Sequence, residues 1–256
     1  MNNSMNNKTY KVQEILSKVN KFNNSNINIK SKTIEFSIKL SKENIPHLLG
    51  LHYMEKKEDK VPAYRKINYI FNENISDQDI LNKVKQNSGF SQMKRVENRI
   101  NSFEDFMNNL EKGIIVEKTL KKGNMAVNYL VVQSKNDDFY HLGILAGNNG
   151  AILEEFNESN EIEKSFFRTY FIEDNIDYFV ETKIMEEITS ISKYNEDLEE
   201  YIPFSFDEDK NKALIEEYKI NKDFNYKEFL KENFDDKEQI KSWNTKNKSH
   251  DDDWER

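Results

Sequence analysis

The sequence of 256 residues contains no cysteine, only 3 prolines, 7 glycines and 4 histidines. The absence of cysteine excludes disulfides, thiolate metal ligands and a cysteine nucleophile. No apolar run approaches the roughly 18 residues that a membrane-spanning helix needs, and the N-terminus lacks the apolar core of a signal peptide. We therefore expect a cytoplasmic protein that has no membrane partner.

Charged and aromatic residues are what the chain has in abundance. Charged residues make up 33% of it, and 17 Phe with 12 Tyr can fill a core that its aliphatic residues alone would not. The charge is unevenly distributed: residues 1–122 hold 22 Lys and Arg against 14 Asp and Glu, residues 123–194 hold 5 against 13, and residues 195–256 hold 11 against 19. A nucleic acid would be attracted to the first segment and repelled by the last. A solvated surface without such a partner is the alternative.

The spacing of apolar residues changes from helical to alternating near Gly113. Before this point a strand over residues 34–40 is accompanied by several helices, one of which we expect to begin at Ser102. After it, alternating runs separated by turns predict antiparallel strands over residues 114–120, 125–134, 139–146, 151–156, 166–171 and 184–192. The pattern predicts an α+β fold, with a helical N-terminal half packed on an antiparallel meander sheet.

Composition divides the chain into three segments. Residues 1–32 read as an N-terminal helix and an Asn-rich connector, residues 33–194 as the α+β domain, and residues 195–256 as an acidic helical extension and tail. We expect two short helices in the extension, over residues 209–220 and 226–234. The extension could be a cap on the sheet, a docking arm or a shield over a basic site.

The most unusual stretch in the sequence is residues 43–54, Glu-Asn-Ile-Pro-His-Leu-Leu-Gly-Leu-His-Tyr-Met. Ser41 is a plausible N-cap before it, and Pro46 sits in the first helical turn, where its missing N–H costs nothing. His47 and Gly50 interrupt an otherwise apolar helix, and a helical glycine costs about 1 kcal/mol relative to alanine. Helix propensity therefore does not explain these two residues.

This stretch resembles a motif of the phage-type branch of the barnase–EndoU–colicin–RelE-like nucleases. Members of that branch have a helix with the sequence Asn-hydrophobic-Pro-His-Leu-x-Gly after an alternating strand. Residues 164–167, Lys-Ser-Phe-Phe, with the acidic turn and alternating run up to residue 193, are similar to the family's closing segment. Residues 125–131 are similar to its central strand, although Asn128 stands where the family usually has Asp. The resemblance covers residues 33–194 and leaves both ends of the chain unexplained.

The resemblance implies a metal-independent endoribonuclease that requires no cofactor. Such an enzyme needs a base for the ribose 2′-OH proton, an acid for the leaving oxygen and cations around the phosphorus. His47 matches the family motif and is the candidate acid/base, because imidazole titrates near neutral pH. The alternative is that His47 only packs its helix against the sheet. His52 lies five residues further on, about 140° round a helix, so we do not expect it to share a face with His47.

Cationic side chains on two predicted elements complete the candidate site. Lys94, Arg95 and Arg99 form a nucleic-acid-binding set, in which Arg95 and Arg99 lie four residues apart on one helical face and could contact neighbouring phosphates. A solvated helix side that pairs with Glu97 or Asp105 is the alternative. No His-Glu-x-x-His or other metal-ligand cluster is present, so no metal site is expected.

Three residues of the predicted strands are further candidates. Ser165 matches the family's small hydroxyl residue. Arg168 shares a predicted strand face with Phe166 and Tyr170 and is either a phosphate clamp or a cover over that aromatic surface. His141 is expected to project from the open face of its strand and contact nucleic acid, unless it is structural.

Two functions from different classes are consistent with these observations. The first is a toxin-like RNA endonuclease of phage or mobile-element origin, with His47, Ser165 and Arg168 as catalytic residues and RNA and a cognate antitoxin as partners. The second is a non-enzymatic phage anti-defence protein, such as an anti-CRISPR inhibitor, whose acidic surface would occupy the nucleic-acid cleft of a host defence protein. A third possibility joins the two, because the acidic extension could mask the chain's own basic site.

Overall fold

The computed structural model describes residues 9–22, 26–118, 127–146, 151–152, 165–174, 185–196 and 198–233. The expected turns at residues 121–124 and 147–150, most of the acidic turn at 174–177, and the tail with Trp254 lie outside these residues. The chain forms two compact units, residues 1–211 and residues 212–256. Apart from most of α6 (Glu208–Asn233), the elements described below belong to the first unit. No helix within the described ranges is long and apolar enough to cross a membrane.

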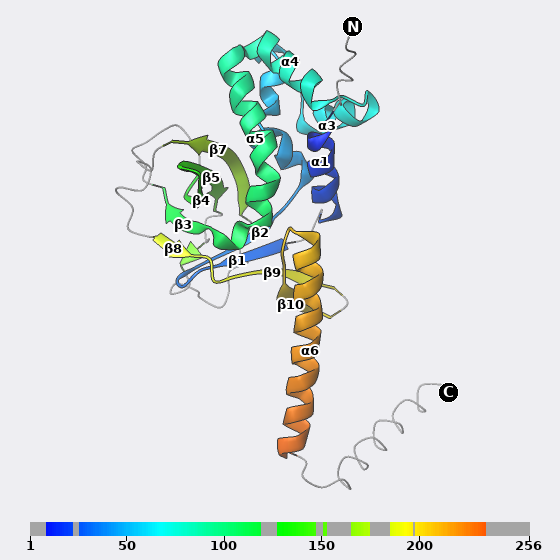
Figure 1. Ribbon diagram of the computed structural model, residues 1–256, viewed down its shortest axis with the longest axis vertical. Coiled ribbons are helices and arrows are strands. Elements are labelled where there is room, and N and C mark those ends of the chain that lie inside the picture. Colours follow the sequence, from blue (N-terminus) through cyan, green and yellow to red (C-terminus); the bar gives the residue numbers. More distant parts are fainter. Residues whose placement is uncertain are drawn as a thin grey trace, which may run out of the picture. The chain divides into compact units, whose positions relative to one another are not determined.

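The helices of the first unit gather on one side of its strands (Figure 1). They are α1 (Lys11–Lys21), the short α2 (Ile45–Leu48), α3 (Ala63–Asn72), α4 (Asp77–Ser88) and the long α5 (Phe90–Asn108). Short 3₁₀ turns join several of them, among them η1 (Lys42–Asn44), η2 (Leu51–Met54) and η4 (Leu110–Lys112). In the described part of the C-terminal extension a single helix, α6 (Glu208–Asn233), replaces the two short helices expected from the sequence.

The strands form two antiparallel five-stranded sheets. The first has the order β10-β9-β1-β2-β6 and the second the order β7-β5-β4-β3-β8. The strands of the first sheet are β1 (Asn26–Lys30), β2 (Ile34–Lys39), β6 (Ala151–Ile152), β9 (Ser190–Asn195) and β10 (Glu200–Pro203). Those of the second are β3 (Ile114–Glu117), β4 (Tyr129–Lys135), β5 (Asp138–Leu145), β7 (Phe166–Glu173) and β8 (Met185–Glu187). The α+β class and the β3–β4–β5 meander are confirmed.

The Asn-rich segment expected to be a connector contains the central strand of the first sheet. Residues 26–30 form β1 because Ile27 and Ile29 alternate with polar residues and are fully buried. β1 pairs with β2 on one side and with β9 on the other. The Asn-rich composition of this segment therefore hid its strand pattern, in which Ile27 and Ile29 belong to the core.

One apolar core joins the helices to both sheets. Val12 and Leu16 of α1, Phe36 of β2, Phe103 of α5 and Tyr170 of β7 are all at most 2% exposed and belong to it. A smaller cluster of Val116, Val127, Leu130, Val132 and Phe171 forms a separate apolar group on the second sheet. The second sheet therefore buries apolar side chains on both of its faces, as strands without strict alternation require.

Side-chain caps define several helix ends. Ser41 accepts a hydrogen bond from Glu43 N, as expected of an N-cap, and Ser76 forms a capping box with Asp79 at the start of α4. Ser102, by contrast, does not begin a helix, because α5 runs through it without interruption. Its hydroxyl instead donates to Asn98 O at 2.7 Å and hydrogen-bonds the Tyr170 hydroxyl at 2.8 Å, which ties α5 to β7.

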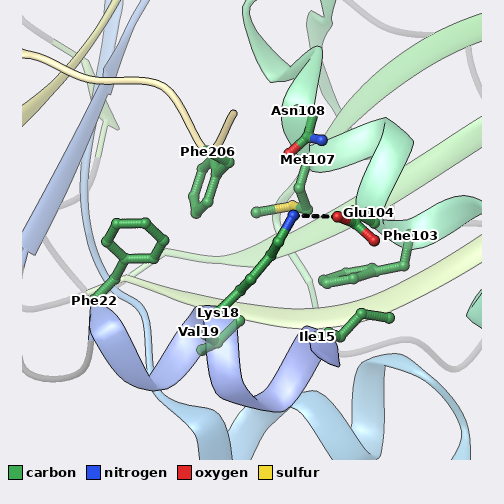
Figure 2. Close-up of a pocket in the computed structure, with 9 residues that line it drawn as sticks. All are labelled: Ile15, Lys18, Val19, Phe22, Phe103, Glu104, Met107, Asn108 and Phe206. Atoms are coloured by element: carbon green, nitrogen blue, oxygen red, sulfur yellow. Dashed lines mark hydrogen bonds and ion pairs between the residues drawn. The ribbon is translucent and has the colours of Figure 1, made fainter. Parts of the chain in front are cut away.

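A small pocket of about 30 Å³ lies between α1 and α5 (Figure 2). It is lined mostly by apolar side chains, including Ile15, Phe22 and Phe206, and an ion pair between Lys18 and Glu104 lies at its edge. Its volume is too small for a nucleotide, and no residue that the sequence predicted to be catalytic or nucleic-acid-binding lines it.

Candidate nuclease-like site

His47 lies at the surface of α2, a single helical turn with Pro46 in its first turn. Ile45 and Leu48 of the same turn are fully buried, so α2 is anchored on both sides of the histidine. The helix ends after Leu48, and Gly50 then adopts φ 76° and ψ 22°. This left-handed conformation favours glycine, since a side chain there meets its own backbone.

The reversal at Gly50 brings a second histidine back onto the first. The ring centroids of His47 and His52 lie 5.2 Å apart with an interplanar angle of 25°, and the Tyr53 ring lies 4.1 Å from that of His52. Our expectation that the two histidines would not share a face was wrong, because the chain does not continue as a helix from residue 47 to residue 52. His52 is partly buried, and its Nδ1 has no hydrogen-bond partner among the described residues.

Arg99 reaches this turn from α5. A Cβ atom built on Gly50 would lie 3.0 Å from Arg99 Nη1 and 3.2 Å from Val96 Cγ2. The guanidinium therefore packs directly against the glycine backbone. Arg95 lies one helical turn earlier and is exposed, and its charge contributes to lowering the pKa of Arg99, although desolvation is the larger cause. The expected i, i+4 arginine pair is present on α5.

Arg168 is placed by an irregularity in β7. On β5 Gly143 pairs with Thr169 and the next residue, Ile144, pairs with Phe167, so Arg168 is the extra residue of a β-bulge. Phe167 and Tyr170 are therefore both buried although they lie three residues apart, and Arg168 is exposed. The expectation that Arg168, Tyr170 and Phe166 share one strand face was wrong for Tyr170, which the bulge places in the core, whereas Phe166 and Arg168 are both exposed.

The electrostatics of the histidines show that these groups lie close together. Partial desolvation, followed by the positive charges of Arg168 and Arg99, lowers the pKa of His47 from its usual value. Desolvation, His47 and Arg99 lower the pKa of His52 to about 4. Both imidazoles are thus neutral at neutral pH and are able to accept a proton.

The structure does not gather every residue predicted for the site. His141 is completely buried and stacks on Phe171 with ring centroids 4.5 Å apart, so the expectation that it projects from an open face was wrong. Ser165 is 1% exposed, and its hydroxyl has no hydrogen-bond partner among the described residues. Lys94 forms an ion pair with Glu97 at 2.8 Å, which is the surface pairing that we gave as the alternative.

Sequence reasoning did not select His52, which stacks on His47, or Tyr53, which packs on His52. The signal for them was Gly50, whose position five residues after Ile45 ends the helix. Asn128, which stands where the resemblance expects an acid, is exposed, and its Oδ1 accepts a hydrogen bond from Ala146 N at 3.1 Å. Within the described ranges no three His, Asp or Glu side chains are grouped as metal ligands would be.

Comparison with known protein families gives one match. The model of the family described as phage-Barnase-EndoU-ColicinE5/D-RelE like nuclease 4 matches residues 11–212, which include α2, α5, β7 and both sheets. No curated protein and no solved structure matches the sequence. The match begins with α1 and ends within α6, so it extends beyond residues 33–194 at both ends.

Proposed function

The chain belongs to the phage-Barnase-EndoU-ColicinE5/D-RelE like nuclease 4 family, and from this premise we propose that it is a metal-independent RNA endonuclease. The cluster of His47, Arg99 and Arg168 would be its reaction centre. The observation that carries the proposal is the placement of Arg168 and Arg99, from separate elements, near enough to His47 for their charges to add to desolvation in lowering its pKa. A neutral imidazole beside fixed positive charges is suited to removing a proton next to a phosphodiester.

In this proposal His47 acts as the general base. It accepts the proton of the ribose 2′-OH, the 2′ oxygen attacks phosphorus, and the bond from phosphorus to the 5′ oxygen breaks. The products are a 2′,3′-cyclic phosphate and a 5′-hydroxyl. The departing 5′ oxygen takes its proton from solvent, because His52, with a pKa of about 4, is not protonated at neutral pH.

Arg99 and Arg168 would stabilise the charge that develops on the phosphate oxygens. Arginine suits this role because its guanidinium is always charged and has a rigid set of donors. Both come from long elements, α5 and β7, while His47 comes from the short α2. Ser165 remains a prediction as a catalytic residue, and its burial means that substrate would reach its hydroxyl only after a local rearrangement.

The test is cleavage of mixed-sequence RNA by purified protein in EDTA. We expect cyclic-phosphate products from the wild type, no cleavage of a 2′-O-methyl RNA, and a rate at least about 100-fold lower for His47→Ala, as is typical for the loss of a general base. His250→Ala is the control, since the proposal gives this histidine no role. Cleavage that is unchanged in His47→Ala, or that requires a divalent metal, would refute the proposal.

The non-enzymatic alternative makes the opposite prediction. A protein that inhibits a host defence complex through the acidic surface of residues 123–256 would not cleave RNA. Charge reversal in residues 195–256 would abolish its inhibition, and His47→Ala would leave inhibition intact. Toxicity on expression of the protein alone, lost in His47→Ala, would favour the nuclease and a role for an antitoxin.

A further inference from the structure

The start of α5 carries an unusual aromatic residue. Phe90 is 58% exposed, more than any other aromatic side chain among the described residues of the first unit. It follows Gly89, whose φ of 87° turns the chain sharply between α4 and α5, and nothing lies within 4 Å of a Cβ built on this glycine. The space around the turn is therefore open. Burying a phenylalanine is normally favourable, so a ring that is more than half exposed beside an open turn is available to a ligand.

Two lysines flank this ring. Lys85 Nζ of α4 lies 5.9 Å from the ring centroid of Phe90, and Lys94 Nζ of α5 lies 5.8 Å from it. Lys94 also forms a surface ion pair with Glu97. An exposed ring with two ammonium groups within 6 Å of its centroid provides a flat apolar surface for a base and positive charge for the phosphates next to it.

The corner that carries Phe90 is joined to the candidate site. Ser88 Oγ donates to Tyr53 O at 3.0 Å, and Asn87 Nδ2 donates to Met54 O at 2.6 Å. These bonds fix the end of α4 to η2, the turn that carries His52. Arg95 and Arg99 lie further along α5. Phe90 and Arg99 are about 13.5 Å apart along the helix axis, at 1.5 Å per residue, and about 180° apart round it.

We propose that Phe90 is a stacking platform for a base of single-stranded RNA, with Lys85 and Lys94 binding the adjoining phosphates, and that the strand then passes round α5 to the reaction centre. This inference rests on the proposed function and adds the form of the substrate. A base in a duplex is already stacked on its neighbours and is not available to the ring, so the platform selects single strands.

The experiment measures binding of the full chain to a labelled 2′-O-methyl RNA oligonucleotide by fluorescence anisotropy, at one fixed salt concentration. We expect Phe90→Ala to weaken binding of the single strand about 5- to 150-fold, the range for loss of one stacked base. Phe90→Trp should restore it, because tryptophan keeps an aromatic face. Binding of a blunt RNA duplex should change less than about twofold in either variant, since it depends on phosphate contacts.

Phe71→Ala is the matched control, because Phe71 is also an exposed phenylalanine, at 40%, on α3. Equal binding of the single strand by wild type and Phe90→Ala would overturn the platform and leave the nuclease proposal intact. An equal loss for single strand and duplex would also overturn it, because the effect would then not be stacking. Failure of the wild type to bind any RNA would overturn both proposals.

Discussion

Gly50→Ala is the substitution that most directly tests how the site is built. Gly50 has φ 76° and ψ 22°, and a non-glycine residue in this left-handed region costs about 1–2 kcal/mol. Its Cβ would also meet Arg99 Nη1 at 3.0 Å, so the guanidinium must move. For a unit of this size about 1–2 kcal/mol lowers Tm by roughly 2–8 °C. We therefore expect a folded protein of reduced stability whose RNA cleavage is impaired well below its Tm.

The contribution of Arg99 can be separated with a double-mutant cycle. In an Arg99→Ala background the added methyl of Gly50→Ala meets no guanidinium, so the backbone strain and the 3.2 Å contact with Val96 Cγ2 remain. We expect the two substitutions to be non-additive by about 0.5 kcal/mol or more in urea unfolding, as is found for residues in contact. Full additivity would show that the guanidinium does not pack on Gly50. Wild-type stability and activity in Gly50→Ala would refute the left-handed turn itself.

Two further substitutions test the electrostatics and the packing. Arg168→Gln removes a positive charge that lowers the pKa of His47, so this pKa rises and the acidic limb of the pH profile of kcat/KM moves to higher pH; Arg65→Gln, an exposed control on α3, should not move it. An unchanged limb would mean that His47 is not the titrating base. Asp77→Ala removes the carboxylate that accepts from the first two N–H groups of α1 at 2.9 and 3.1 Å, and should cost about 1–3 kcal/mol in urea unfolding without changing the pH profile. Asp105→Ala, which breaks an exposed ion pair, should cost at most about 1 kcal/mol, and equal costs would contradict this assignment.

Most helices and strands could be predicted from local patterns because their apolar spacing is regular. The core positions of α1, namely Val12, Ile15, Leu16 and Val19, are buried as helical spacing requires. The alternating run of β2 likewise buries Ile34, Phe36 and Ile38. What failed was the identification of boundaries. Ser102 has the chemistry of an N-cap, but its hydroxyl instead contacts Tyr170 of a strand 68 residues away. Nothing in the local sequence indicates that long-range partner.

Arg99 and Arg168 were predicted as phosphate contacts from charge and spacing, and the structure brings both near His47. His52 was not predicted because we assumed a straight helix through Gly50. The left-handed conformation of this one residue ends the helix and changes the direction of the chain. His141 was assigned to an open face because alternation gives two faces but does not say which one is covered. The apolar cluster with Phe171 shows that the second sheet has no wholly polar face on which it could project.

The bulge at Arg168 explains why the site needs a departure from regular strand geometry. In an unbroken strand Phe167 and Tyr170 would point to opposite faces, yet both are buried in the same core. One extra residue between them lets both side chains point into the core, and that residue is not paired with any residue of β5. A charged side chain at that position is exposed without removing any apolar contact from the core. Two buried aromatics three residues apart, with an arginine between them, are thus a pattern from which a bulge and an outward cation can be predicted together.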